Sequence, residues 1–324
     1  MSRESEILVG DVGGTHARFA IIDTAQTPFA VAQRVDFGAQ NFDSFQAVLQ
    51  AYLERVGAEQ PHAAALAVAG PVTDGQVQLT NRGWHLSEHD MHEIGFKQAL
   101  LINDFVAPAF ALPHLPAQSF RSLGHERQGL EGAPITVLGA GTGLGVSCLA
   151  RYRGRSVPIA TEGGHIGFAP RGETQIAVLQ ILARRFGHVS VERILSGPGQ
   201  ENVYMALEEI AGRKSPPLSA EEITKQAEDG DAACRAALDL FCSVYGAVAG
   251  DFALAHGARG GVFIAGGIAA KIESYLQHSD FRAAFENKGR LSYFVQPIPT
   301  RLILEKDIAF LGAAYALLEF RDSR

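Results

Sequence analysis

Two hairpin-like segments of the same design constrain the fold of this chain more than any other feature. Residues 7–22 and 135–149 each contain an apolar stretch, a turn of glycine and threonine, and a second apolar stretch. This pattern is typical of a β-hairpin. Glycine accepts positive φ and lacks a Cβ atom, so a ligand can approach the turn backbone closely, and exposed turn amides can bind an anion. The pair of hairpins predicts a polyphosphate site and leads to the hypothesis of a sugar or acid kinase.

Composition narrows the class of protein. The chain has 324 residues, of which 47% are hydrophobic and 19% are charged, as is ordinary for a globular enzyme of about two domains. Its net charge of −7 argues against a nucleic-acid-binding surface. The polar start and the lack of an apolar run of about 18 residues argue against a signal peptide and a membrane span, so we expect a cytoplasmic protein.

The cysteines agree with that expectation. All three, Cys148, Cys234 and Cys242, lie in apolar segments, and the sequence has no Cys-x-x-Cys motif and no Cys/His cluster. We therefore expect reduced thiols in the core and no structural zinc site.

The first half of the chain alternates between strand-like and helix-like segments. Apolar periodicity and turn residues predict a hairpin over 7–23, a helix over 41–55, a strand over 63–69, a helix from Ser87 to Ile94, a strand over 99–102 and a helix over 105–112. The prolines and glycines of residues 113–133 mark the best candidate for a crossover between domains.

Helical patterns dominate the second half. They cover 174–186, 199–211, 232–256 and 308–320, with a surface loop over 213–217 and a strand over 261–265. Gly246 and Gly250 lie four apart in one helix, which indicates close core packing in a soluble protein or a dimerisation face in a membrane, and we favour packing. The repeated hairpin suggests two related lobes around a cleft.

Polar residues at two strand ends are candidates for the chemistry. Asp11 follows the first strand, where its carboxylate can hold Mg²⁺ through water or hydrogen-bond the nearby turn amides. Asn103 and Asp104 follow another strand, at the end where open α/β sheets place ligands. Asp104 can accept the proton of a sugar hydroxyl, and the pair can at the same time cap the next helix.

Three other segments each have two interpretations. Glu162 and His165 lie in a glycine-rich loop, and such acceptors and donors suit polyol recognition better than a purely structural role. Glu192 is interpreted first as a carboxylate in the opening turn of a helix with Ser190 as its cap. Gly266-Gly267 joins a strand to a helix, where it either admits a nucleotide or forms a simple tight turn.

Six motifs occur in an order that resembles one known family. They are LVGDVGGT (8–15), INDF (102–105), GAGTGLG (139–145), EGGH (162–165), ERILSGPG (192–199) and GVFIAGGI (261–268). From about residue 7 to residue 318, the chain closely resembles the bacterial glucokinases of the hexokinase/actin/Hsp70-like superfamily. The cysteine-rich zinc motif of the related repressor/ORF/kinase family and a helix-turn-helix extension before residue 7 are absent, which places the chain with the zinc-free group.

The resemblance implies an α/β chain with a two-lobed actin-like ATPase fold, ribonuclease H-like lobes and an active site in the interlobe cleft. Residues 1–113, completed by a C-terminal helix over about 306–324, form the implied small domain, and residues 114–305 form the large one. The implied reaction transfers the γ-phosphoryl group of ATP to the 6-hydroxyl of D-glucose with Mg²⁺, in a homodimer. The implied glucose-binding residues are Asn103, Asp104, Glu162, His165 and Glu192, with Asp104 as the general base.

This assignment reverses the first interpretation of Glu192. The implied nucleotide-binding residues are Gly10, Asp11, Val12, Gly13, Gly14, Thr15, Gly141, Thr142, Gly143, Gly266 and Gly267, with Asp11 also the residue for Mg²⁺. His16 departs from the family pattern, because many relatives have asparagine there. The alternatives are another hexose or amino-sugar kinase of the same fold and a catalytically silent sugar-sensing regulator. The presence of Asp104 and of both glycine turns argues against a protein without catalytic activity. We expect no nucleic-acid or membrane partner.

Overall fold

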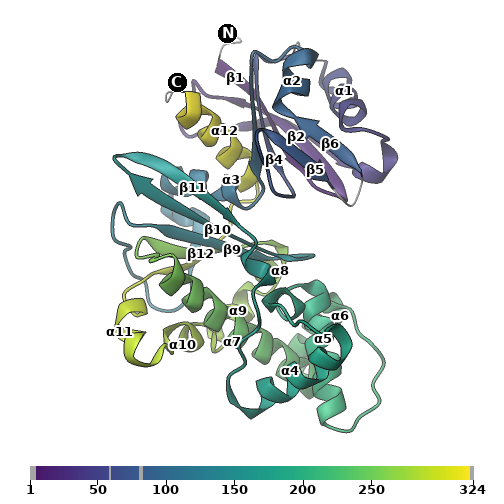
Figure 1. Ribbon diagram of the computed structural model, residues 1–324, viewed down its shortest axis with the longest axis vertical. Helices are drawn as coiled ribbons and strands as arrows, with labels where there is room; N and C mark the ends of the chain where they lie inside the picture. The colour runs from purple at the N-terminus through teal and green to yellow at the C-terminus, as the bar shows by residue number, and fades with distance from the viewer. Residues whose placement is uncertain (1–4, 58–59, 80–82, 322–324) are drawn as a thin grey trace. The chain divides into compact units, whose positions relative to one another are not determined.

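The structure is a computed structural model that describes residues 5–57, 60–79 and 83–321 (Figure 1). The chain divides into two compact units. Unit 1 contains Met1–Ser119, Tyr152–Ala160 and Glu305–Arg324, and unit 2 contains Phe120–Arg151 and Thr161–Leu304. Unit 1 includes residues 114–119 and 152–160. The sequence, in contrast, predicts that these residues belong to the large domain. That division into functional domains stays a prediction.

Unit 1 is built on a five-stranded sheet with the strand order β3-β2-β1-β4-β7. The strands are β1 (Glu6–Val12), β2 (His16–Asp23), β3 (Val31–Gly38), β4 (Ala63–Val68) and β7 (Gln98–Asn103). β1 and β2 form the predicted antiparallel hairpin, whereas β1, β4 and β7 run parallel to one another. The carboxyl ends of these three parallel strands therefore meet at one edge of the sheet.

Further α-helices of unit 1 pack around this sheet, and two further strands, β5 and β6, form a separate two-stranded sheet. These elements are α1 (Phe45–Val56), β5 (Gln76–Leu79), β6 (Trp84–Ser87), α2 (Glu88–Ile94), α3 (Val106–Ala111) and α12 (Ile308–Arg321). α2 begins as predicted, because Ser87 Oγ accepts a hydrogen bond from Asp90 N. The C-terminal helix α12 packs on α3, β1 and β4 (Figure 1), while residues 322–324 of the predicted helix lie outside the described residues.

The second large sheet has the strand order β11-β10-β9-β12-β13-β8, and its unit 2 strands β10-β9-β12-β13 repeat the pattern β2-β1-β4-β7 of unit 1. These strands are β8 (Phe120–Ser122), β9 (Ile135–Ala140), β10 (Leu144–Tyr152), β12 (Gly261–Ala265) and β13 (Thr300–Ile303), and β11 (Arg155–Thr161) lies mostly within unit 1. β9 and β10 form the second predicted hairpin, and β12 and β13 run parallel to β9. The repeat found in the two hairpins thus extends to the strands beside them.

Helices form most of the rest of unit 2, and α7 lies in its core (Figure 1). They are α4 (Gly172–Phe186), α5 (Gly197–Ile210), α6 (Ala220–Asp229), α7 (Ala232–Ala255), α8 (Gly267–Lys271), α9 (Glu273–His278), α10 (Phe281–Glu286) and α11 (Ser292–Val295). A Cβ atom on Gly246 would lie 1.9 Å from Phe281 O, and one on Gly250 would lie 2.5 Å from Phe285 O. Both glycines therefore serve the close packing of α7 against α10, as predicted.

Helix α7 also has the length and apolar character of a membrane span, and no other helix in the described ranges does. However, 78% of its most apolar window is buried inside unit 2. Its sequence is thus explained by its place in the core, where it packs against α5, α6 and α10.

The structure adds elements that local patterns did not predict. The segment 113–133, expected as a crossover, contains β8, which pairs with β13. Helix α6 follows the predicted loop, and Ser219 and Glu222 form a capping box at its start. Strands β3, β11 and β13 were not predicted either, because strand formation depends on partners that are distant in sequence.

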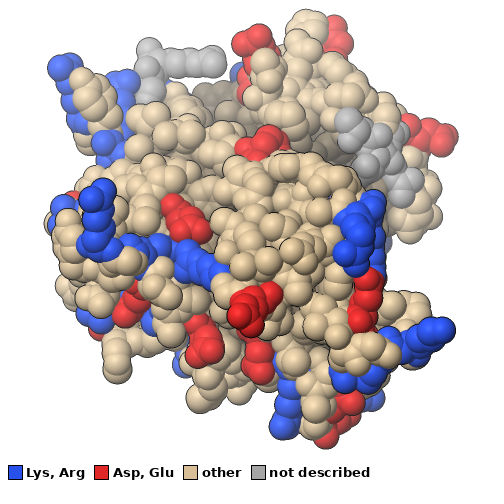
Figure 2. Space-filling model, turned by 60° about the horizontal axis from the view of Figure 1, so that its bottom comes forward, with Lys and Arg blue, Asp and Glu red and all other residues tan. Residues whose placement is uncertain are grey.

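The surface mixes both signs of charge. Figure 2 shows Lys and Arg side chains interspersed with Asp and Glu over the visible face. Ion pairs between exposed side chains include Arg184–Glu209 at 2.7 Å. Exposed pairs of this kind contribute about 0–1 kcal/mol each, so the two apolar cores dominate the stability of the fold.

Candidate functional site

The turn of the unit 1 hairpin, residues 13–15, lies at the end of the buried strand β1. Gly13 N donates to His16 O at 2.9 Å and closes the turn, and the rest of the turn is partly or fully exposed. Gly10 and Val12 are buried within β1. The roles of this segment in nucleotide binding stay predictions.

Asp11 is held by an ion pair across the hairpin. Its Oδ2 accepts a hydrogen bond from Arg18 Nη1 at 3.1 Å, and the two residues lie directly opposite each other in the β1–β2 register. The Asp11 side chain is 27% exposed. Its partial burial nevertheless raises the pKa of the carboxyl above the ordinary value of 3.8, an effect that the Arg18 guanidinium opposes.

The Asp11 carboxylate fits the role of a Mg²⁺ residue. In kinases Mg²⁺ takes one or two carboxylates together with phosphate oxygens and waters. The Arg18 contact uses Asp11 Oδ2. The other carboxylate oxygen, Oδ1, has no hydrogen-bond partner in the described part of the chain. No group of three or more His, Cys, Asp or Glu side chains suited to a metal occurs among the described residues, so a metal here would depend on the phosphates.

Asn103 ends β7, and its side chain fixes the start of α3. Its Oδ1 accepts hydrogen bonds from Phe105 N at 3.0 Å and from Val106 N at 3.3 Å. Its Nδ2 donates to Gly70 O at 3.0 Å. The N-cap of α3 is Phe105, not the predicted Asn103–Asp104 pair, but Asn103 still bonds the start of the helix, and its amide ties β7 to the loop after β4.

Asp104 is the next residue, at the same edge of the sheet as Asp11. Its backbone N donates to Val68 O at 3.0 Å, and Val68 is paired in register with Val12 on one side and Asn103 on the other. Its side chain is partly buried. The sheet thus brings the candidate base and the candidate Mg²⁺ residue to the ends of β7 and β1, the two parallel strands on either side of β4.

The turn of the unit 2 hairpin has the same character. Gly141 N donates to Gly143 O at 2.8 Å, and Thr142 between them is exposed. Gly266 packs beside this turn, because a Cβ atom on it would lie 2.5 Å from Ala140 O and its φ is +90°. The two predicted nucleotide-binding segments of unit 2 are therefore adjacent.

Glu192 lies in a short 3-10 turn (Val191–Arg193) and reaches the second hairpin. Its Oε2 accepts a hydrogen bond from Leu144 N at 2.9 Å. Ser190 makes no side-chain capping bond to this turn. The first interpretation therefore holds in position only: Glu192 lies in the first turn after Ser190 at the N-cap, but the Ser190 side chain does not cap it. The carboxylate also contacts Leu144, the residue that follows the turn of the second hairpin.

Glu162 is the N-cap residue of another 3-10 turn (Gly163–His165), and His165 is the last residue of that turn. His165 Nε2 lies 3.9 Å from Glu162 Oε2, and the two side chains are 62% and 69% exposed, so the pair contributes little to stability. A Cβ atom on Gly164 would lie 2.1 Å from Leu144 O, which shows that the loop packs directly on β10. Unit 2 thus brings together Glu162, His165 and Glu192, whose binding of a sugar stays a prediction.

A group of glycines occupies positions where the fold does not require glycine. They are Gly13, Gly141, Gly167, Gly197 and Gly267. None of them has a positive φ, and a Cβ atom added to any of them would lie at least 3.7 Å from the nearest atom. The first two lie in the hairpin turns, and Gly267 begins α8. Gly197 N donates to Gly141 O at 2.8 Å. These open positions leave room beside the backbone for a ligand.

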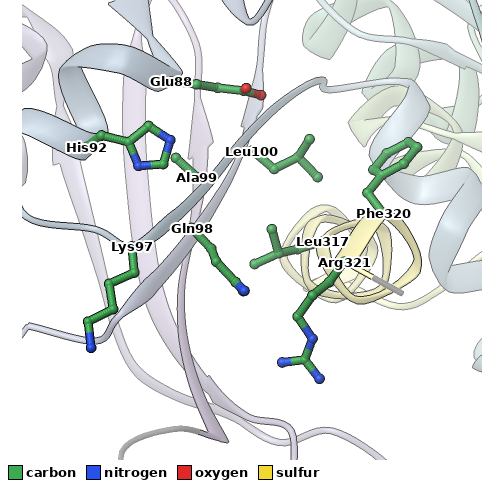
Figure 3. Close-up of a pocket in the computed structure, with 9 residues that line it drawn as sticks. All are labelled: Glu88, His92, Lys97, Gln98, Ala99, Leu100, Leu317, Phe320 and Arg321. Atoms are coloured by element: carbon green, nitrogen blue, oxygen red, sulfur yellow. The ribbon is translucent and has the colours of Figure 1, made fainter. Parts of the chain in front are cut away.

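A cavity of about 510 Å³ in unit 1 contains none of these residues (Figure 3). It lies between α2, β7 and α12, and Glu88, Lys97 and Arg321 contribute to its lining. Glu88 Oε1 accepts a hydrogen bond from Leu101 N at 3.0 Å, so this carboxylate caps the outer edge of β7. Lys97 and Arg321 are exposed residues, and the cavity has the character of a surface groove.

Two residues that contact the predicted site were not singled out from the sequence. Arg18 pairs with Asp11, and the hairpin register around a turn at residues 13–15 was a signal that could have placed it there. Leu144 contributes its backbone amide to Glu192, which no side-chain pattern reveals.

Comparisons with known proteins agree with the predicted resemblance. The sequence profile of the family described as Glucokinase matches residues 8–320. The chain is 44% identical to a glucokinase of Caulobacter sp. (strain K31), over 96% of this chain and 94% of that protein. It is 41% identical to a glucokinase of Escherichia coli (strain K12 / DH10B), over 94% and 95%. The predicted resemblance is confirmed.

Solved structures confirm the predicted fold class. A glucokinase from an Antarctic psychrotroph has a TM-score of 0.88 and 39% identity, covering 97% of this chain and 99% of that one. A ROK family glucokinase from Streptomyces griseus, solved in complex with glucose and AMPPNP, has a TM-score of 0.64 and 17% identity, covering 95% and 98%. The second likeness shows the fold alone. Both support an α/β chain of the actin-like ATPase fold.

Proposed function

The chain belongs to the glucokinase family, and on this premise we propose that it transfers the γ-phosphoryl group of ATP to the 6-hydroxyl of D-glucose. The products are glucose 6-phosphate and ADP. The structural observation that carries the proposal is the pair of hairpin turns whose Gly13 and Gly141 the fold itself does not require. A backbone left open in this way suits close contact with phosphate oxygens.

Phosphoryl transfer depends mainly on positioning and on neutralising charge. In the proposed reaction the turn amides, together with the hydroxyls of Thr15 and Thr142, bind phosphate oxygens. Mg²⁺, when bound, neutralises phosphate charge, and Asp11 is the residue that would hold it. Asp104 accepts the proton of the 6-hydroxyl.

The sugar hydroxyls are the proposed ligands of Asn103, Glu162, His165 and Glu192. Asn103 Oδ1 already accepts two backbone hydrogen bonds, which fixes the direction of the amide. The two carboxylates accept hydrogen bonds from hydroxyls, and a charge-assisted bond of this kind contributes about 1.5–3 kcal/mol. These residues supply the selectivity of the proposed site.

A coupled assay of ADP formation with several sugars tests the proposal. We expect the highest kcat/KM with glucose, and lower values with mannose, fructose and N-acetylglucosamine, because a missing or misplaced hydroxyl leaves a polar group of the site unpaired. A higher kcat/KM with one of the other sugars would favour the alternative hexose or amino-sugar kinase. Sugar binding without ADP formation would favour the silent regulator.

Replacing Asp11 with asparagine separates function from stability. Because burial raises the pKa of this carboxyl in the folded protein, its ionised form is disfavoured by folding at neutral pH. The melting temperature of Asp11→Asn at pH 7 is therefore expected not to fall. We expect the Mg²⁺ concentration for half-maximal activity to rise by about 10–100-fold, as for loss of a group that orients a metal-bound ligand.

Asp36→Asn is the matched control for this experiment. Asp36 lies in the same unit, and its hydrogen bond with the Arg34 guanidinium lowers the pKa of its carboxyl. The control is expected to lose a little stability at neutral pH and to keep the wild-type Mg²⁺ dependence. An unchanged Mg²⁺ dependence in Asp11→Asn would remove Asp11 from the metal site.

Assembly and location stay predictions from the family resemblance. We propose a homodimer, for which light scattering should give twice the chain mass of 34.6 kDa. We also propose a cytoplasmic location, since the apolar helix α7 is accounted for by the core of unit 2.

A further inference from the structure

We propose that Glu192 links the sugar to the nucleotide, so that each ligand strengthens the binding of the other. The inference rests on the proposed function, because it assigns glucose to Glu192 and phosphate to the turn Gly141–Gly143. It adds a positioning role in which one carboxylate holds the phosphate turn while it binds a sugar hydroxyl.

The first support is the contact between Glu192 and the end of the turn. Glu192 Oε2 accepts the Leu144 amide at 2.9 Å, and Leu144 is the first residue after the turn. A Cβ atom on Gly143 would lie 2.5 Å from the same oxygen. The absence of a side chain at residue 143 therefore makes room for the carboxylate against the turn.

The second support is a contact between the segment that follows Glu192 and the other end of the turn. Gly197 N donates to Gly141 O at 2.8 Å. Between the two contacts, the buried Ser196 Oγ donates to Glu192 O at 2.8 Å and accepts from Gly199 N at 3.0 Å. The segment from Glu192 to Gly197 is therefore fixed to residues 141 and 144, and a displacement of one moves the other.

The third support is the second oxygen of the carboxylate. Glu192 is partly buried, and the only hydrogen bond of its side chain within the described residues is made by Oε2. Oε1 is left to accept a sugar hydroxyl without breaking the Leu144 bond. A sugar held in this way fixes the carboxylate and, through it, the phosphate turn, so less ordering remains for the nucleotide to bring about.

Such coupling is reciprocal and typically changes an affinity by about 5–150-fold. Calorimetric titration of the full chain with Mg²⁺ and AMPPNP, with and without saturating glucose, measures it. For the wild-type protein we expect glucose to lower the AMPPNP dissociation constant by a factor within that range. In Glu192→Gln the factor should fall towards one, because the amide has a single oxygen for two donors.

Glu162→Gln is the matched control. Glu162 belongs to the same candidate sugar site, but its one recorded side-chain partner is His165 at 3.9 Å, not the turn. This variant is expected to need more glucose for saturation while keeping the wild-type coupling factor. Hydrogen exchange gives a second readout, since the Leu144 amide should exchange faster in Glu192→Gln with the melting temperature unchanged.

The outcomes separate the two proposals. If the wild-type protein binds glucose and AMPPNP with a coupling factor of one, or if both variants lose the coupling equally, Glu192 is not the link. An unchanged factor in Glu192→Gln also overturns it. If the wild-type protein binds no glucose at all, the proposed function fails, and this inference fails with it.

Discussion

Asp104→Asn is expected to lower kcat with glucose by about 10²–10⁴-fold, the usual effect of losing a general base. The asparagine keeps the size of the side chain but cannot accept the hydroxyl proton at neutral pH. The change leaves the backbone bond from Asp104 N to Val68 O at 3.0 Å in place, and the melting temperature of the variant checks that the fold is kept. Steady-state kinetics and a glucose titration measure the effect, and glucose binding should persist.

Asp43→Asn, a change at an exposed aspartate of the same unit, is the control and should retain wild-type kcat. The assignment of the base is wrong if Asp104→Asn keeps more than about a tenth of the wild-type kcat. A loss of kcat accompanied by a lower melting temperature would point to a structural role instead.

Gly141→Val is expected to weaken ATP binding by about 10–100-fold for each charge-assisted amide–phosphate bond lost, since such a bond contributes about 1.5–3 kcal/mol. The fold offers open space at this position, with no atom within 4 Å of an added Cβ. The melting temperature should therefore stay close to that of the wild-type protein. Separate calorimetric titrations with AMPPNP and with glucose distinguish the two affinities.

Two further variants calibrate this result. Gly141→Ala adds only the Cβ atom and should have a smaller effect than valine. Gly246→Ala places a Cβ atom 1.9 Å from Phe281 O, and it should lower the melting temperature because the fold requires glycine there. If Gly141→Val behaves like Gly246→Ala, or loses glucose and nucleotide affinity equally, the turn serves the fold and not the phosphates.

Local signals in the sequence predicted much of the fold correctly. Ser87 marked the start of α2, and the two glycine turns marked both hairpins, because capping and turn chemistry act over a few residues. Strands β8 and β13 pair through residues 120–122 and 301–303 in the structure, and such pairing depends on distant partners. The capping box at Ser219 could have predicted the start of α6 from local sequence. The helix was missed because the prediction relied on apolar periodicity.

The candidate site was predictable to the extent that its residues lie at strand ends and in glycine loops. The sequence identified Asp11, Asn103 and Asp104 at the ends of β1 and β7. It misjudged the local surroundings of Glu192, since the contact with Leu144 joins residues 48 positions apart. That contact arises from the packing of unit 2, and no spacing within the motif encodes it.

Identification of the phosphorylated product tests the central claim most directly. Wild-type protein incubated with Mg²⁺, ATP and glucose labelled with carbon-13 at C6 should give ADP and a single sugar phosphate in equal amounts. Phosphorus-31 and carbon-13 NMR should show coupling between the new phosphate and the labelled carbon. ADP formed without a sugar phosphate, a phosphate on another hydroxyl, or no turnover with glucose would contradict the account.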